Sequence, residues 1–166
     1  MSLPSSPLTT PREAPKRKKR LVPVPWRRRP TILLVEDDCE MRRMIARVLR
    51  ADGYHVVERA DGDEALDWLG YGVLDGYHER LPALIVSDIR LPFYDGFELL
   101  EAMQGAIDRV PVILITGFPD EDVFRKAFAF GARNVLAKPF DLEDLRGAVW
   151  AALEPGEPPP GRFRPY

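Results

Sequence analysis

Five short, mostly apolar runs recur along this chain, and a segment long enough for a helix follows each of them. The runs cover residues 31–35, 54–57, 83–86, 112–115 and 134–137, and none contains Asp, Glu, Lys or Arg. Strands that are buried on both faces of a parallel sheet have this composition. The alternation therefore predicts an α/β fold, a doubly wound five-stranded parallel sheet with helices on both faces.

The segments between the runs carry helix signals. The first has the periodicity of an amphipathic helix. Its expected buried stripe is Met41, Met44, Ile45, Val48 and Leu49, with Arg42, Arg43, Arg47 and Arg50 outside. A second helix is expected from Asp61 to about Leu69, because Asp61 and Glu64 form a capping-box pattern, and residues 70–82 are expected to connect it to the next strand.

Polar residues close four of the runs. They are Glu36, Asp37 and Asp38 after the first, Asp88 after the third, Thr116 after the fourth, and Lys138 with Pro139 after the fifth. Ligands bind at the carboxyl ends of strands in open α/β sheets, so these side chains are expected to converge. Carboxylates, a hydroxyl and an ammonium in one pocket suit phosphoryl transfer. Taken singly, each is an ordinary strand end, since Asp commonly opens a turn.

Residues 31–153 resemble the receiver domain of bacterial two-component response regulators. The resemblance rests on the order of the residues at the strand ends, which is an acid pair, then an Asp, then a Thr, then Lys-Pro. The resemblance implies a flavodoxin-like receiver fold with strand order 2-1-3-4-5, here of the single-domain type. It implies that Asp88 accepts a phosphoryl group from a sensor histidine kinase or a phosphotransfer protein, in a phosphorelay that acts through protein contacts. It also implies that the protein is no enzyme beyond catalysing its own phosphorylation and dephosphorylation.

The resemblance further implies a Mg²⁺ cofactor. The implied ligands are Glu36, Asp37, Asp88 and the backbone carbonyl of Arg90. Lys138 is expected to contact the phosphoryl oxygens, and the Thr116 hydroxyl to bond the new phosphoryl group and report it. The bond before Pro139 is expected to be cis by analogy with the family.

One position departs from the family pattern. Receivers usually carry an aromatic residue three positions before the lysine, and its rotation accompanies the shift of the threonine; Val135 stands there in this chain. Phe118, or repacking of residues 117–131, is the expected substitute. Phe124, Phe128 and Trp150 are expected to form a patch for a homodimer or a downstream protein, with core packing as the competing interpretation.

Two other functions compete with the response regulator. A receiver-like protein-interaction module that no longer cycles is favoured by Val135 and opposed by the intact set of acids, Thr116 and Lys138. An Asp-nucleophile enzyme of the haloacid dehalogenase type expects a second Asp two residues after the nucleophile, where this chain has Arg90.

Charge divides the chain into a basic leader, an acidic domain and a short tail. Residues 1–30 hold nine Lys or Arg and one acid, whereas residues 31–154 carry a net charge of −11. The leader and the Pro-rich tail at 155–166 are expected to be disordered. The leader's charge suggests nucleic acid only weakly, since a solvated tail, or one that folds back on its own domain, has the same composition. The single cysteine, Cys39, and the absence of a membrane-spanning apolar stretch suggest a cytoplasmic protein.

Overall fold

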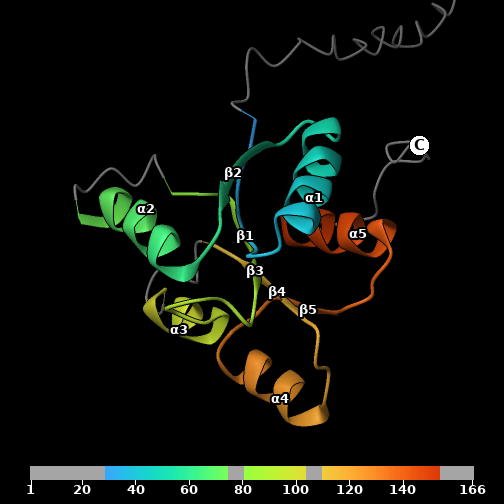
Figure 1. The fold of residues 1–166 in the computed structure, drawn as a ribbon. Coiled ribbons are helices and arrows are strands. Elements are labelled where there is room, and N and C mark those ends of the chain that lie inside the picture. Colours follow the sequence, from blue (N-terminus) through green and yellow to red (C-terminus); the bar gives the residue numbers. More distant parts are fainter. Residues whose placement is uncertain (1–28, 75–80, 104–109, 154–166) are drawn as a thin grey trace, which may run out of the picture.

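The computed structural model describes residues 29–74, 81–103 and 110–153, and the side chains at 71–74 are outside that description. Strands and helices alternate through it (Figure 1). They are β1 (Thr31–Val35), α1 (Cys39–Ala51), β2 (His55–Arg59), α2 (Gly62–Leu74), β3 (Leu84–Asp88), α3 (Gly96–Ala102), β4 (Val112–Thr116), α4 (Glu121–Ala129), β5 (Asn134–Ala137) and α5 (Leu142–Leu153). The five strands form one parallel sheet in the order β2-β1-β3-β4-β5, which confirms the predicted fold. The expected disorder of residues 1–30 and of the tail at 155–166 falls outside the described residues, apart from residues 29 and 30.

Helices cover both faces of the sheet (Figure 1). Alternate residues of β1 point to opposite faces of the sheet. Ile32 and Leu34 pack on the face covered by α1 and α5, and Leu33 and Val35 pack on the face covered by α2, α3 and α4. All residues of β3 and β4 are buried, as expected for central strands of a parallel sheet. No helix among the described residues is both long and apolar enough to cross a membrane.

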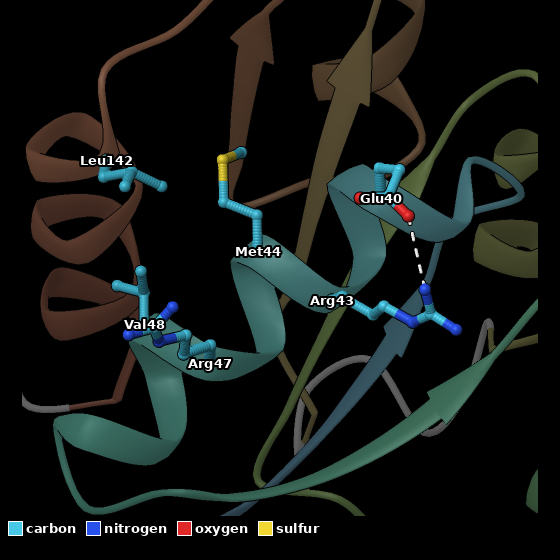
Figure 2. Close-up of a pocket in the computed structure, with 6 residues that line it drawn as sticks. All are labelled: Glu40, Arg43, Met44, Arg47, Val48 and Leu142. Atoms are coloured by element: carbon cyan, nitrogen blue, oxygen red, sulfur yellow. Dashed lines mark hydrogen bonds and ion pairs between the residues drawn. The ribbon is translucent and has the colours of Figure 1, made fainter.

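Helix α1 buries most of the expected stripe. Asp38 is its N-cap and accepts hydrogen bonds from the backbone N–H groups of Glu40 and Met41, both at 2.9 Å. The prediction was wrong for Met44, which is 42% exposed because it lies at the edge of a hollow between α1 and α5 (Figure 2). It was also wrong for Arg42, whose guanidinium turns back and donates to the Glu36 carbonyl.

Two boundaries differ from the prediction. Strand β2 is shifted and runs two residues further, to Arg59, and α2 continues to Leu74 instead of ending near Leu69. Gly70 falls inside α2, where a glycine costs only about 1 kcal/mol relative to alanine and is outweighed by packing. Part of the expected connection at 70–82 is therefore helix, while residues 75–80 lie outside the described residues.

Candidate functional site

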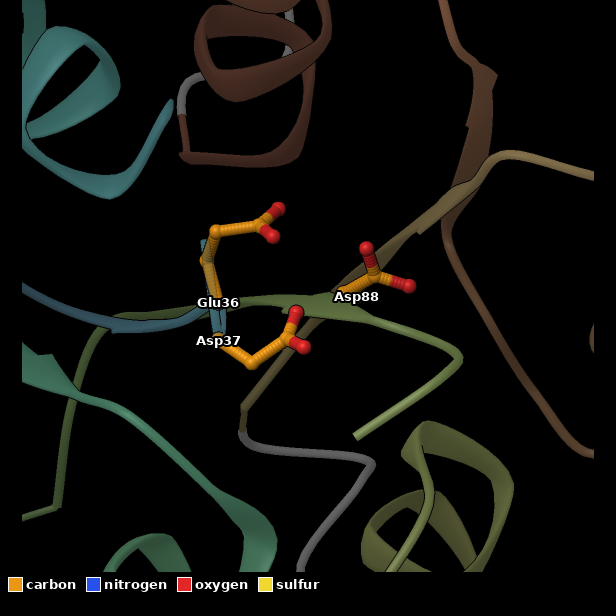
Figure 3. Close-up of side chains that lie close together, drawn as sticks. All are labelled: Glu36, Asp37 and Asp88. Atoms are coloured by element: carbon orange, nitrogen blue, oxygen red, sulfur yellow. The ribbon is translucent and has the colours of Figure 1, made fainter. Parts of the chain in front are cut away.

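Three carboxylates meet at the carboxyl end of the two neighbouring strands β1 and β3. Glu36 and Asp37 follow β1, and Asp88 is the last residue of β3 (Figure 3). The register pairs Val35 with Ser87, which places the two strand ends side by side. One carboxylate oxygen from each residue lies within 4.8 Å of the others. Like charges this close repel one another and create a demand for cations.

Lys138, directly after β5, supplies one of those cations. Its ammonium donates to Glu36 Oε2 at 2.9 Å and to Asp88 Oδ2. Burial raises the pKa of Glu36 above its ordinary value; the hydrogen bond from Lys138 opposes this rise and the charge of Asp88 adds to it. Burial lowers the pKa of Lys138, but its bonds to Asp88 and Glu36 outweigh burial and keep it raised. The ammonium therefore stays charged between the two acids.

Thr116 completes the set that the sequence singled out. It ends β4, is buried, and its hydroxyl accepts a hydrogen bond from the Phe118 backbone N–H at 3.1 Å. Strand β4 lies between β3 and β5 in the sheet. Thr116 therefore lies between Asp88, at the end of β3, and Lys138, directly after β5. The Lys138–Pro139 peptide bond is cis, as in the expectation from the family.

The turn after β3 fixes the Asp88 carboxylate. The Arg90 backbone N–H donates to Asp88 Oδ1 at 2.7 Å, and Gly96 N–H donates to the Ile89 carbonyl at 2.9 Å. The Arg90 guanidinium stacks 3.5 Å from the centre of the Phe118 ring, so the loops after β3 and β4 touch at the site. Sequence reasoning missed this contact, because Arg90 and Phe118 are far apart along the chain and each is exposed on its own.

Gly96 has no room for a side chain. A Cβ there would lie 2.6 Å from the Asp88 carbonyl oxygen and 2.9 Å from Ile89 Cα. We expect Gly96→Ala to lower the free energy of unfolding by about 1–3 kcal/mol, because backbone must move to relieve the clash. Gly70→Ala is the matched control, since nothing lies within 4 Å of its Cβ position. Urea unfolding of both variants measures the difference, and a Gly96→Ala protein as stable as wild type would contradict the packing described.

The donor set fits a small divalent cation. The Lys138 ammonium pairs with Glu36 and Asp88, so the cluster of three carboxylates keeps an excess of negative charge. Hard oxygen donors are the ligands that Mg²⁺ prefers. The Arg90 carbonyl adjoins this cluster in sequence as the fourth ligand expected from the protein. When bound, Mg²⁺ supplies positive charge that offsets the carboxylates and an incoming phosphoryl group.

Residues 32–150 match the response regulator receiver domain family. The chain belongs to this family. Receivers accept a phosphoryl group in two-component signalling and bind Mg²⁺, and the acidic cluster fits such a site. A receiver is a signalling module rather than an enzyme, which decides against the haloacid dehalogenase alternative, and the family implies a histidine kinase or phosphotransfer partner.

Relatives of this receiver differ in length. It is 30% identical over 118 residues to sporulation initiation phosphotransferase F of Bacillus subtilis, covering 71% of this chain and 89% of that protein. It is 33% identical over 124 residues to the transcriptional regulatory protein PdtaR of Mycobacterium tuberculosis, covering 74% of this chain but 56% of that one. The receiver domain of an HD domain-containing protein from Pseudomonas fluorescens is similar in structure, with 31% identity, a TM-score of 0.66, and coverage of 76% of this chain and 96% of that chain.

The expected interface patch is smaller in the structure. Trp150 is 5% exposed, because α5 buries a wide arc of its surface, so this residue cannot belong to an exposed patch. Phe128 is 53% exposed, and Phe124 is half-buried against the core. Core packing thus accounts for Trp150, while Phe124 and Phe128 stay candidates for a partner surface.

Proposed function

We propose that this chain acts as a stand-alone response regulator, phosphorylated on Asp88, within a phosphorelay. The single observation that carries the proposal is the position of Asp88, at a buried strand end with one carboxylate oxygen bonded to Lys138 and the other to the Arg90 N–H. The stand-alone role is supported by the coverage of 89% of phosphotransferase F, a protein of about receiver size. The match covers only 56% of PdtaR, so a receiver that works within a longer protein is the alternative.

In the proposed reaction, an Asp88 carboxylate oxygen attacks the phosphorus of a phosphohistidine on the partner. A P–O bond forms as the P–N bond breaks, and the imidazole nitrogen keeps the electron pair, so the product is an acyl phosphate. Lys138 lies within bonding distance of Asp88 and is placed to hold charge on the phosphoryl oxygens. Glu36 and Asp37, with Asp88 and the Arg90 carbonyl, would hold Mg²⁺ beside it.

We further propose that Thr116 reports the modification. Its hydroxyl accepts from Phe118 N–H and has its own proton to donate to a phosphoryl oxygen, so a turn of this side chain moves the loop at Phe118. Val135 is 7% exposed and offers no aromatic ring for the usual relay. The Arg90–Phe118 contact gives this loop a second link to the site.

Thr116→Val tests the reporting step, because valine keeps the shape of threonine and removes the hydroxyl. We expect the variant to accept a phosphoryl group from a small acyl phosphate with Mg²⁺ while losing the phosphorylation-dependent amide shifts of residues 117–130. Two-dimensional NMR before and after phosphorylation measures this. Full shifts in Thr116→Val would show that another group carries the signal.

The non-cycling module is the second candidate, and Val135 is its support. Intact mass of the full chain, incubated with Mg²⁺ and a small acyl phosphate, separates the two. A gain of one phosphoryl group supports the response regulator. Mg²⁺ binding without that gain supports the interaction module.

A further inference from the structure

A hollow of ≈ 530 Å³ runs along β5, the strand at one edge of the sheet. We call it the β5 groove; it lies between α4 and α5, and its walls include Phe124, Val135, Pro139, Phe140, Asp144 and Gly147. Two aromatic rings and a proline make much of this surface apolar. A Cβ at Gly147 would meet nothing within 4 Å, so the α5 side of the groove is open.

The rim of the β5 groove is acidic where α4 and α5 begin. The exposed acids at the starts of these two helices are Asp120, Glu121, Asp122, Asp141, Glu143 and Asp144, and of these Glu143 and Asp144 line the groove itself. Three basic groups of the same two helices are engaged: Arg125 pairs with Asp122, Arg146 is buried and pairs with Glu143, and Lys126 lies 4.1 Å from the centre of the Phe97 ring. The exposed Arg133 precedes β5, at the end of the groove opposite the acidic rim. An apolar hollow beside surplus acids calls for a ligand that is both apolar and cationic.

The chain itself contains such a ligand ahead of β1. Residues 21–26 read Leu-Val-Pro-Val-Pro-Trp, between the basic run of residues 16–20 and the three arginines of residues 27–29. Alternate prolines exclude a helix and favour the extended polyproline II form. Aromatic-lined grooves recognise Pro-rich segments of this kind. The charge of residues 16–29 is opposite to that of the rim.

The leader is long enough to reach. The Pro30 carbonyl accepts from His55 N–H at 3.0 Å, which fixes the leader's end at the start of β1. Three strand spacings separate β1 from β5, about 14 Å, and the four residues from Pro30 back to Trp26 span up to about 14 Å. Residues 21–25 in the polyproline II form are about 15 Å long. The groove from Asn134 to Pro139 has a similar length, roughly 17 Å in extended chain. The run at 16–20 arrives at the acidic rim.

A second hollow suits this ligand less well. It lies between α1 and α5 and is lined by Glu40, Arg43, Met44 and Arg47 (Figure 2). Glu40 pairs with Arg43, so the unbalanced charge there is that of Arg47, which repels a basic segment. Exposed acids also lie on α2 and α3, among them Asp63 and Glu98. The basic leader could bind there instead, and the test below includes that outcome.

We propose that residues 16–29 dock in the β5 groove of their own domain, with Trp26 and the prolines on its apolar walls and residues 16–20 at its acidic rim. The docked leader covers Phe124 and the outer side of β5 until a stronger ligand displaces it. This proposal does not depend on phosphorylation and is tested in the unmodified protein.

The test is a paramagnetic relaxation experiment on the full chain at low salt. Cys39 is exposed, so Cys39→Ser with Val22→Cys allows one nitroxide to be attached in the leader. We expect the amide signals of Asn134 and Gly147 to lose most of their intensity while Asp67 on α2 keeps its own. Broadening should disappear in high salt, which screens the rim.

Gly147 provides matched variants. Gly147→Arg and Gly147→Glu add side chains of similar length in open space, and both improve helix propensity. We expect the arginine to abolish broadening at Asn134 and the glutamate to keep it, with neither variant lowering the melting temperature.

Three results would overturn the proposal: no broadening along the groove, broadening centred on α2 and α3, or equal broadening in both Gly147 variants. A further experiment mixes spin-labelled protein with ¹⁵N-enriched protein that carries no spin label. Broadening in that mixture would mean that the leader docks on a second copy, which also contradicts docking within one chain.

Discussion

Asp88→Asn is expected to lose the whole phosphoryl gain that the wild-type protein shows with Mg²⁺ and a small acyl phosphate. An asparagine amide has no carboxylate oxygen to form an acyl phosphate. Asn can still accept the hydrogen bond that Arg90 N–H gives to Asp88 Oδ1 at 2.7 Å, so the turn after β3 should hold. Removing one of three close negative charges also eases repulsion at the site. Intact mass measures the loss, and thermal unfolding checks that the variant is folded.

Asp67→Asn is the control for that experiment, because Asp67 is an exposed acid on α2, outside the carboxylate cluster. It should gain a phosphoryl group at the wild-type rate. If a folded Asp88→Asn protein still gained one, the acceptor would be another side chain, and Asp37 would be examined first.

Asp52→Ala is expected to lower the free energy of unfolding by about 3 kcal/mol, the low end for breaking a buried ion pair. Asp52 caps the end of α1 and binds the guanidinium of Arg146 on α5 through both carboxylate oxygens, with side chains 6% and 3% exposed. Hydrogen bonds from Arg146 to Asp52 raise the pKa of Arg146, so the guanidinium cannot escape its burial by losing a proton. Glu143 stays as a partner in the variant, which limits the cost. Urea unfolding measures it.

A double variant separates an uncompensated charge from lost packing. Asp52→Leu with Arg146→Met removes both charges and keeps apolar bulk, and it should recover most of the stability. Glu143 loses its partner there at little cost, because its side chain is 61% exposed. A double variant that is no more stable than Asp52→Ala would show that lost packing, not the buried guanidinium, accounts for the loss; the α1 cap is unchanged in both, because Asp52 caps the helix through its backbone N–H.

The fold was predictable because each strand contains a short uncharged run, and the segments between the runs carry helix signals. Asp38, Asp95 and Asp120 cap α1, α3 and α4, directly after or between the predicted runs. The end of α2 was missed because Gly70 resembles a stop signal, yet here it is an ordinary helical residue that packing tolerates. Burial of Trp150 and exposure of Met44 depend on how each helix packs in the fold, which periodicity within one helix cannot reveal.

The sequence allowed the residues of the site to be predicted, but not the contacts between their side chains. Parallel strands bring Glu36, Asp88 and Lys138 to one edge, and the structure places Lys138 on both acids. The stacking of Arg90 on Phe118 depends on the shapes of two loops, which residue types do not determine. The part of Arg42 in holding the Glu36 carbonyl was hidden because its spacing resembles that of a solvent-exposed helix residue.

Reductive trapping of the phosphorylated protein tests the central claim most directly. Borohydride reduces an aspartyl phosphate to homoserine, and peptide mass spectrometry locates the product. The account predicts homoserine at position 88 in wild-type protein treated with Mg²⁺ and acyl phosphate, and none without the phosphate donor. Homoserine at Asp37 instead, or a borohydride-resistant phosphoester on Ser87 or Thr116, would contradict it.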